Sequence, residues 1–167
     1  MSTMSTQPTI HVRFATKEDA PFILEMVREL AIYEKAADAV HATVEGFEKW
    51  LFEQPVAECL VGLIDGVPRG IALFFVNFST WESGPGLYLE DLYVQQDFRG
   101  HGLGKALFSK LAQLAVERNY CRITWACLDW NTPSLEFYRS LGATQKSDWI
   151  THQLKEPDFL RLINPEL

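Results

Sequence analysis

The sequence predicts a mixed α+β fold, in which a mostly antiparallel sheet contains a central parallel strand pair and is flanked by helices. Two observations lead to this prediction. Asp65-Gly66 stands between the apolar runs 58–64 and 70–78, and an Asp-Gly pair in that setting is a strong hairpin signal. Further on, an apolar strand at 88–94 is followed by a glycine turn, a helix and another apolar stretch at 122–128. A strand, helix and strand of this length imply two parallel strands joined by a right-handed crossover.

The N-terminal half is predicted to begin with a strand at 10–14 and a helix capped by Thr16, with Asp19 three residues later. This helix ends near Tyr33-Glu34. Its apolar stripe consists of Phe22, Ile23, Met26, Val27 and Leu30. A second, shorter helix is expected to start after Thr43 and to stop at Pro55.

The central helix carries Leu103, Leu107, Leu111 and Leu114 on one side, and Asn119 is predicted to cap its end in a left-handed conformation. A last helix is expected to have Thr132 as N-cap, Pro133 as its first residue and Gly142 as its end. A final strand at 149–154 and a short tail from Pro157 complete the prediction. We expect one domain at 10–167, preceded by a disordered tail at 1–9.

Charge and hydropathy narrow the classes of protein to which the chain can belong. The net charge is −7 and the sequence has no basic cluster, so nucleic acid is not an expected partner. An acidic surface suits a cationic substrate, although ordinary solubility explains it equally well. The N-terminal segment is polar and uncharged, and no apolar run is long enough to span a membrane. These features predict a cytoplasmic protein that does not bind membranes.

Neither the cysteines nor the histidines are spaced as metal ligands. Cys59, Cys121 and Cys127 each fall in or directly beside a predicted strand, and their odd number and wide spacing favour reduced cysteines in the core. The four histidines are scattered along the chain. We therefore expect no metal site.

The loop at 99–105 is predicted to bind an anion. It reads Arg99-Gly100-His101-Gly102-Leu103-Gly104-Lys105 and opens the central helix. Glycines at alternate positions let the backbone turn sharply and direct N–H groups toward one point, where the helix dipole is positive. A P-loop would need a glycine at Arg99 and Ser or Thr at Ala106, and a dinucleotide fingerprint would need a different glycine spacing. A phosphate or pyrophosphate remains the natural ligand.

Two adjacent carboxylates, Glu90 and Asp91, stand in the middle of the strand before this loop. Regular alternation would place Asp91 on the same face as Leu89 and Tyr93, and Glu90 on the other face. Neighbouring elements should cover both faces, so neither carboxylate is expected to have a solvent side. A buried carboxylate without a partner titrates at a raised pKa, so the pair are either ion-paired structural groups or include a tuned base.

A second motif follows downstream, in which 131–134 reads Asn-Thr-Pro-Ser and precedes Phe137-Tyr138. Together with the glycine loop, it resembles the GCN5-related N-acetyltransferases (GNAT), and more specifically the diamine (spermidine/spermine) N-acetyltransferases. In the loop before the central strand, Ser79-Thr80 precede Trp81, which is more similar to the related thialysine branch. The matching segments are Arg13-Phe14-Ala15-Thr16, Tyr33-Glu34, 87–91, the glycine loop, Trp130-Asn131, Phe137-Tyr138 and Trp149.

The resemblance implies the GNAT fold, acetyl-CoA as acetyl donor and a set of residues that hold it. Backbone groups of Leu92, Tyr93 and Val94 would bind the thioester and pantetheine arm. The pyrophosphate would lie against the loop, and a second segment would complete the site. These two groups are Arg99, Gly100, His101, Gly102, Leu103, Gly104 and Lys105, and Asn131, Thr132, Pro133 and Ser134.

The resemblance also implies the acceptor, which is a primary amine on a small cationic molecule such as a diamine, a polyamine or thialysine. The amine would attack the thioester directly. Glu90 would accept the amine proton, with Asp91 as the alternative base, and Tyr138 would protonate the CoA thiolate. The residues expected to line the acceptor site are Tyr33, Glu34, Glu90, Asp91, Thr124, Trp125 and Ala126. A homodimer is implied as well. The alternatives are an acetyltransferase for protein N-termini or lysines, and a non-catalytic acyl-CoA sensor.

Overall fold

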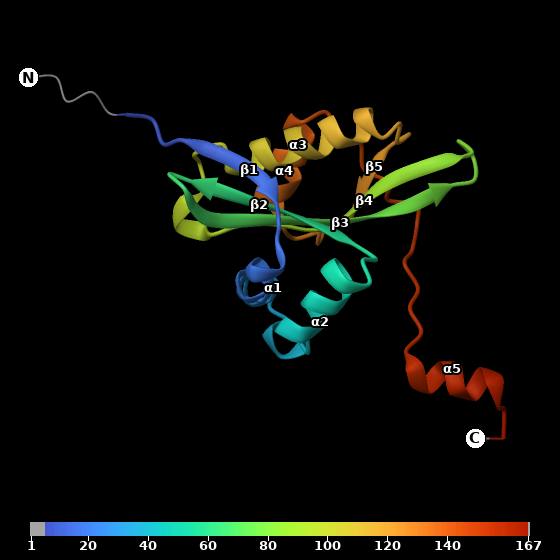
Figure 1. The fold of residues 1–167 in the computed structure, drawn as a ribbon. Helices are drawn as coiled ribbons and strands as arrows, with labels where there is room; N and C mark the ends of the chain where they lie inside the picture. Colours follow the sequence, from blue (N-terminus) through green and yellow to red (C-terminus); the bar gives the residue numbers. More distant parts are fainter. Residues whose placement is uncertain (1–5, 167) are drawn as a thin grey trace, which may run out of the picture. The chain divides into compact units, whose positions relative to one another are not determined.

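The structure is a computed structural model that describes residues 6–166. Its first compact unit ends at Leu128 and is built on one five-stranded sheet in the order β1-β2-β3-β4-β5 (Figure 1). Strands β1 to β4 pair antiparallel, whereas β4 and β5 are parallel. The predicted mixed sheet with one parallel pair is therefore confirmed. The strands are β1 (Ile10–Phe14), β2 (Glu58–Ile64), β3 (Val67–Ser79), β4 (Gly84–Val94) and β5 (Ile123–Trp125).

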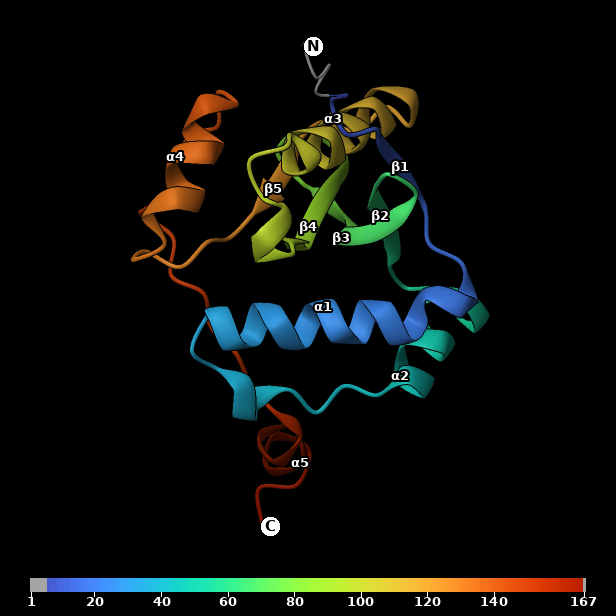
Figure 2. The same ribbon diagram turned by 90° about the vertical axis from the view of Figure 1, so that its left-hand side faces the viewer.

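Helices cover both faces of this sheet. Helices α1 (Ala20–Tyr33) and α2 (Val44–Glu48) lie on one face, and α3 (Leu103–Glu117) lies on the other (Figure 2). Helix α2 continues as a π-helical turn, Lys49–Glu53, before β2. Asn119, just beyond α3, has a φ of 57°, as predicted for a left-handed cap.

The start of α1 is fixed to the first strand by an ion pair. Asp19 accepts hydrogen bonds from the backbone N–H of Thr16 (2.7 Å) and from both Nη atoms of Arg13 on β1 (2.6 and 3.0 Å). The Arg13 guanidinium therefore holds the pKa of Asp19 below its usual range. Thr16, the predicted cap, is instead the N-cap of a 3₁₀ turn, Lys17–Asp19, and the N-cap of α1 is Asp19. At the next helix, the predicted cap is present, because Oγ1 of Thr43 accepts a hydrogen bond from the N–H of Gly46 (3.0 Å).

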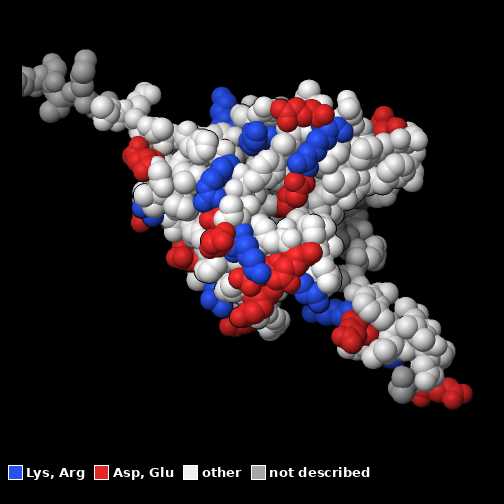
Figure 3. Space-filling view, in the orientation of Figure 1, with Lys and Arg blue, Asp and Glu red and all other residues white. Residues whose placement is uncertain are grey.

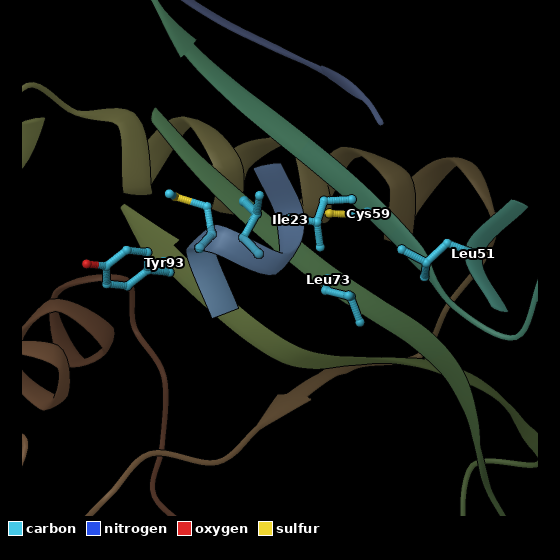
Figure 4. Packing of buried hydrophobic residues seen from close by; sticks show 7 residues of the cluster. Ile23, Leu51, Cys59, Leu73 and Tyr93 are labelled. Atoms are coloured by element: carbon cyan, nitrogen blue, oxygen red, sulfur yellow. The ribbon is translucent and has the colours of Figure 1, made fainter. Parts of the chain in front are cut away.

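The core beneath α1 consists of apolar side chains from both the helix and the sheet. Figure 4 shows Ile23 of α1 beside Cys59 of β2 and Leu73 of β3, with the ring of Tyr93 at one end of the cluster. Ile23 and Met26, two members of the predicted stripe, are fully buried. Their burial against the strands stabilises the packing of α1, by about 1.5–3 kcal/mol for each large apolar side chain.

A β-bulge interrupts β4 in its middle. Leu73 of β3 pairs with Asp91, but Phe74 pairs with Leu89, so Glu90 is an extra residue without a cross-strand partner on β3. Because cross-strand partners share a face, Asp91 lies on the α1 face with Leu73, whereas Leu89 lies on the α3 face with Phe74. The expectation that Asp91 and Leu89 share a face is therefore wrong, since the bulge breaks the alternation on which it depended.

Two further expectations for the first unit need correction. The predicted strand 122–128 is shorter, since β5 comprises Ile123–Trp125 alone. Of the three cysteines, Cys59 is buried in β2, but Cys121 is exposed before β5 and Cys127 is half-buried after it. Only one of the three is a core residue, because β5 ends before Cys127 and starts after Cys121.

The second unit begins at Asp129 and contains α4 (Thr132–Ser140) and α5 (Glu156–Ile163). The predicted strand at 149–154 is wrong, because those residues form no strand, and helix α5 replaces the predicted tail. Pro157 lies in the first turn of α5, where its missing N–H costs nothing. The N-cap of α4 is Asn131 rather than Thr132, since Oδ1 of Asn131 accepts from the N–H of Ser134 (3.4 Å).

Candidate active site

Asp91 is the carboxylate that the fold places in an unusual environment. It is half-buried on the α1 face, and burial raises its pKa to about 6, with the charges of Glu90 and Glu34 adding to the effect. Glu90, in contrast, is exposed. The expectation that neither carboxylate has a solvent side is therefore wrong for Glu90, which the bulge releases from the regular pleat.

The third carboxylate of this cluster comes from the end of α1. Glu34 is the C-cap residue of that helix, and burial raises its pKa. Within residues 6–166, none of Glu34, Glu90 and Asp91 forms an ion pair. The C-terminal end of a helix also carries partial negative charge, so a cation near these groups would be stabilised from two sources.

The surface around these elements is acidic as well. Figure 3 shows Asp and Glu side chains gathered over the face formed by α1 and α2, while Lys and Arg lie more singly across the rest of the view. This distribution agrees with the net charge of −7. It favours the approach of a cationic ligand toward the α1 side of the sheet.

The edge of β4 that faces β5 is open beyond the acidic pair. Only three residues of β4, 87–89, pair with β5, at 123–125. In the described part of the chain, residues 90–94 therefore have no strand partner on this edge. An extended molecule with amide groups can add to such an edge by hydrogen bonding to the backbone of Leu92, Tyr93 and Val94.

The glycine loop forms the N-terminus of α3. Gly100 and Gly102 have φ of 83° and 87°, so two of the three glycines adopt the left-handed conformation, which is consistent with the predicted sharp turn. The first intrahelical bond is donated by Ala106 to the carbonyl of Gly102 (3.0 Å). The N–H groups of 103–105 precede this bond and point out of the helix end, as an anion site requires.

Leu103 holds this loop against the sheet through a contact with Gly62 that the sequence did not predict. The Leu103 side chain is buried and occupies the space above Gly62 of β2, where a Cβ would lie 2.7 Å from its Cδ1. Gly62 therefore makes room for the first residue of α3. Sequence alone offers only an isolated glycine inside a predicted strand, which signals close approach but does not identify the partner.

Arg99, the first residue of the loop, turns back toward α1. Its Nε donates to the carbonyl oxygen of Val94 (3.0 Å), and its guanidinium lies over the rings of Tyr33 (5.2 Å) and Tyr93 (5.4 Å). The structure thus brings together a residue of the predicted anion loop and one of the predicted acceptor site. His101 is exposed in the same loop.

The predicted acceptor residues of β5 do not all reach Asp91. Trp125 pairs with Leu89 and packs edge to face against Phe108 of α3, with ring centroids 4.9 Å apart. It therefore lies on the face opposite Asp91. Thr124 pairs with Tyr88, whose ring packs against Phe75 of β3 at 5.1 Å, and Ala126 follows the end of the strand.

The second unit carries the remaining predicted residues. Asn131 is buried at the start of α4, Thr132 and Pro133 form its first turn, and Tyr138 is half-buried with its ring 5.6 Å from that of Phe137. The predicted roles of this segment and of Tyr138 stay predictions from the resemblance.

A group of residues that the sequence reasoning did not select lies beside Tyr33. Glu29, Arg69 and Gln95 line a pocket of about 480 Å³ together with Tyr33 and Tyr93. No sequence signal marks them, since each looks like an ordinary polar residue on a helix or at a strand end. Only the packing of α1 against the ends of β3 and β4 brings them together.

Two kinds of feature are absent from residues 6–166. No helix there is long and apolar enough to cross a membrane. No three His, Cys, Asp or Glu side chains are grouped so that they could hold a metal ion.

Comparison with known proteins places this chain in a family. Residues 22–143 match the model of the acetyltransferase (GNAT) family. The chain is 35% identical over 152 residues to a thialysine N-epsilon-acetyltransferase of Bos taurus, with 84% of this chain and 89% of that protein covered. It is 26% identical over 195 residues to an L-ornithine N5-acetyltransferase of Arabidopsis thaliana, with 86% of each covered.

Among solved structures, the fold is similar to that of an integron cassette protein from the mobile metagenome of V. cholerae. The TM-score is 0.76 at 20% identity, with 93% of this chain and 98% of that chain covered. The fold, the family match and the identity to thialysine enzymes agree with the resemblance inferred from the sequence. The chain therefore belongs to the acetyltransferase (GNAT) family and is an N-acetyltransferase.

Proposed function

We propose that the protein transfers an acetyl group from acetyl-CoA to a primary amine of a small cationic acceptor, either a diamine or polyamine or an amino acid such as thialysine. The observation that carries this proposal is the carboxylate cluster on the α1 face. Asp91, with a pKa of about 6, lies beside the open edge of β4 and near Glu34 at the negative end of α1. Acidic groups without cationic partners suit a cationic substrate.

Asp91 is suited to take a proton from the acceptor. An alkylamine has a pKa of ~10.4, so at neutral pH it arrives protonated and must lose a proton before it can attack. A carboxylate with a pKa of about 6 is ionised at pH 7.5, yet it is more basic than an ordinary aspartate. Glu90 is the other proposed base, and its exposed position on the bulge would let it act through water or attract the cation.

The residues around β4 and α3 fit an acetyl-CoA molecule. Its thioester supplies the activated acetyl group. Leu92, Tyr93 and Val94 would hold the pantetheine arm through backbone groups on the open edge of β4. The N–H groups of 103–105, at the positive end of α3, would hold the pyrophosphate, and the side chain of Lys105 would add a charge.

The proposed reaction needs two proton transfers, one from the attacking amine and one to the leaving thiolate. The amine nitrogen forms a bond to the thioester carbon, its proton passes to Asp91 or Glu90, and the carbon–sulfur bond breaks. A thiolate with a pKa of ~8.5 leaves more readily when a hydroxyl donates a proton to it. We assign that donation to Tyr138, with Asn131 to Ser134 completing the cofactor site, as the resemblance implies.

The proposed activity is tested by release of the free CoA thiol from acetyl-CoA. Spermidine, putrescine, thialysine, lysine and a short peptide are offered in parallel. Turnover with thialysine well above spermidine supports an amino acid acceptor, and the reverse order supports a polyamine. If only the peptide is acetylated, the enzyme modifies proteins. Tight acetyl-CoA binding with no turnover on any amine would instead indicate a sensor.

We also propose a homodimer, which the resemblance implies. Its support is apolar surface on each unit: in the first, Val76, Phe78 and Trp81 at the end of the β3–β4 hairpin are 50%, 62% and 87% exposed. In the second, α5 exposes Leu162 and Ile163. Apolar surface of this kind is typical of interfaces. Sedimentation that finds only monomer at micromolar concentration would exclude the dimer.

A further inference from the structure

The pocket beside Tyr33 has polar lining residues, Glu29, Arg69 and Gln95, to which the proposed reaction assigns no role. It opens between the C-terminal half of α1, the start of β3 and the turn that follows β4. Its lining includes Glu29, Tyr33, Arg69, Tyr93, Gln95 and Phe98, all of which belong to the first unit.

The pocket lining carries three charged residues, Glu29, Arg69 and Asp97, and three hydrogen bonds hold the first two of them in place. Glu29 accepts from the hydroxyl of Tyr93 (3.0 Å, at Oε2) and from Nε2 of Gln95 (3.2 Å, at Oε1). Oε1 of Gln95 accepts in turn from Nη1 of Arg69 (3.2 Å). The amide of Gln95 therefore stands between a carboxylate and a guanidinium, joined to both, and it keeps these opposite charges from pairing directly.

Both charges retain unused capacity for a ligand. A guanidinium has five N–H donors, and within residues 6–166 Arg69 donates one hydrogen bond and forms no ion pair. Its plane lies over the ring of Phe98 at 3.8 Å, which fixes the side chain against the pocket wall. Among the same residues, the only side chains that donate to Glu29 are the neutral ones of Tyr93 and Gln95. A molecule with a carboxylate and an ammonium close together would complement both residues.

We propose that this pocket recognises the α-amino and α-carboxylate groups of an amino acid acceptor, with Arg69 binding the carboxylate and Glu29 the ammonium. The inference rests on the proposed function and narrows its substrate class to α-amino acids with a second amine at the end of the side chain. It makes Arg69 a specificity-determining residue, since a diamine or polyamine has no carboxylate for Arg69 to bind.

The pocket lies at a suitable separation from the acidic cluster. Tyr33 lines the pocket, and the next residue is Glu34, whose charge acts on Asp91. Along β4, Asp91 and Gln95 are four residues apart, which corresponds to about 13 Å of strand. An extended side chain with a terminal amine, together with the protein side chains that reach toward it, can bridge this interval. The terminal amine would then meet Asp91 while the α-carbon groups stay in the pocket.

A pair of acceptors that differ by one carboxylate tests this proposal. Thialysine and bis(2-aminoethyl) sulfide have the same chain, and only thialysine carries the carboxylate. In Arg69→Gln, we expect kcat/KM for thialysine to fall by about 10- to 100-fold, because a charge-assisted hydrogen-bond pair is lost. The value for the sulfide diamine and the KM for acetyl-CoA should stay within about threefold of wild type. Arg28→Gln, at an exposed position of α1 outside the pocket, is the matched control.

Other outcomes would overturn the assignment. Equal losses on the two acceptors would make Arg69 a structural residue, and a raised KM for acetyl-CoA would mean that it binds a phosphate of the donor. If Arg69→Gln does not fold, Arg69→Lys replaces it, since it keeps the charge but loses the planar fork. If wild type acetylates no amine, the proposed function fails separately, and calorimetry then tests the pocket. A preference for binding thialysine over the diamine that Arg69→Gln abolishes would support the pocket; equal binding would refute it.

Discussion

Asp91 lies directly across from Leu73 on β3, although Leu89, two residues earlier on β4, pairs with Phe74. The bulge at Glu90 produces this relationship. It turns Asp91 toward the α1 face, among apolar groups that raise its pKa to about 6. One extra backbone residue thus decides which carboxylate is half-buried and which is exposed.

Replacing Asp91 tests its proposed role as the proton acceptor. In Asp91→Asn, we expect kcat/KM to fall by about 10²- to 10⁴-fold, the usual contribution of general base catalysis. The acidic limb of the wild-type profile should lie near pH 6, the pKa of Asp91, and it should be absent from any residual activity. Steady-state rates between pH 5 and 9 measure both effects.

Glu90→Gln is the matched variant for the base assignment, because it changes the adjacent carboxylate. If Asp91 is the base, Glu90→Gln keeps the acidic limb and shifts it slightly downward, since the nearby negative charge that raises the pKa of Asp91 is gone. A limb that disappears in Glu90→Gln and stays in Asp91→Asn would assign the base to Glu90 instead.

The same carboxylate should lower stability at neutral pH. Its pKa is raised from 3.8 to about 6 on folding, so the folded state binds the proton more tightly than the unfolded chain does. Any stability from this group is present below pH 4 and is lost as the pH rises through 6. Asp91→Asn should therefore raise the free energy of unfolding at pH 8 by at most about 3 kcal/mol.

Denaturant unfolding of wild type and Asp91→Asn at pH 8 and pH 4.5 checks this pH dependence. The increase in the free energy of unfolding caused by Asp91→Asn should be smaller at pH 4.5, because most Asp91 side chains of the wild type are then protonated in the folded protein. A gain of equal size at both pH values would mean that packing, and not ionisation, is responsible.

Tyr138→Phe should affect turnover much more than donor binding. If the hydroxyl protonates the leaving thiolate, kcat falls by about 10²-fold or more, while the dissociation constant of acetyl-CoA changes little. Phenylalanine keeps the ring and its contact with Phe137, so the helix should remain folded. Turnover measurements and calorimetric titration of acetyl-CoA separate the two effects. Unchanged turnover would exclude Tyr138 from the reaction.

Gly70 should be required for the position of β4, the strand proposed to hold the thioester. It lies opposite Val94 on the neighbouring strand, and a Cβ at this position would come within 2.7 Å of the carbonyl oxygen of Tyr93. Because the contact is with backbone, Gly70→Ala should displace β4 there, lower the free energy of unfolding by about 1–3 kcal/mol and raise the KM for acetyl-CoA.

Gly84→Ala is the control for this substitution. Its nearest contact would be at an ordinary 3.8 Å, and the position lies at the other end of β4. This variant should leave the free energy of unfolding and the KM for acetyl-CoA nearly unchanged. If Gly70→Ala and Gly84→Ala behave alike, the close approach of β3 and β4 has no role in donor binding.

Local patterns in the sequence were enough to predict the helices α1 and α3, the hairpin, the parallel pair and the glycine loop that opens α3. Each follows from local chemistry: the spacing of apolar residues, caps such as Thr43, and glycines at positions of positive φ. The prediction for the C-terminal segment was wrong. The segment 149–154 has strand-like composition, but a strand needs a neighbour to satisfy its backbone, and Pro157 with Asp158 favours a helix start instead.

The details of the site depend on how the helices and strands pack against one another. The bulge at Glu90 depends on how β3 and β4 pair, and no residue in the sequence marks it. The pocket of Glu29, Arg69 and Gln95 joins residues from three separate elements, and the raised pKa of Asp91 depends on burial by α1. Local patterns encode elements, because their causes lie within a few residues. Charges and cavities depend on residues far apart in the chain, so they become defined only when the elements pack.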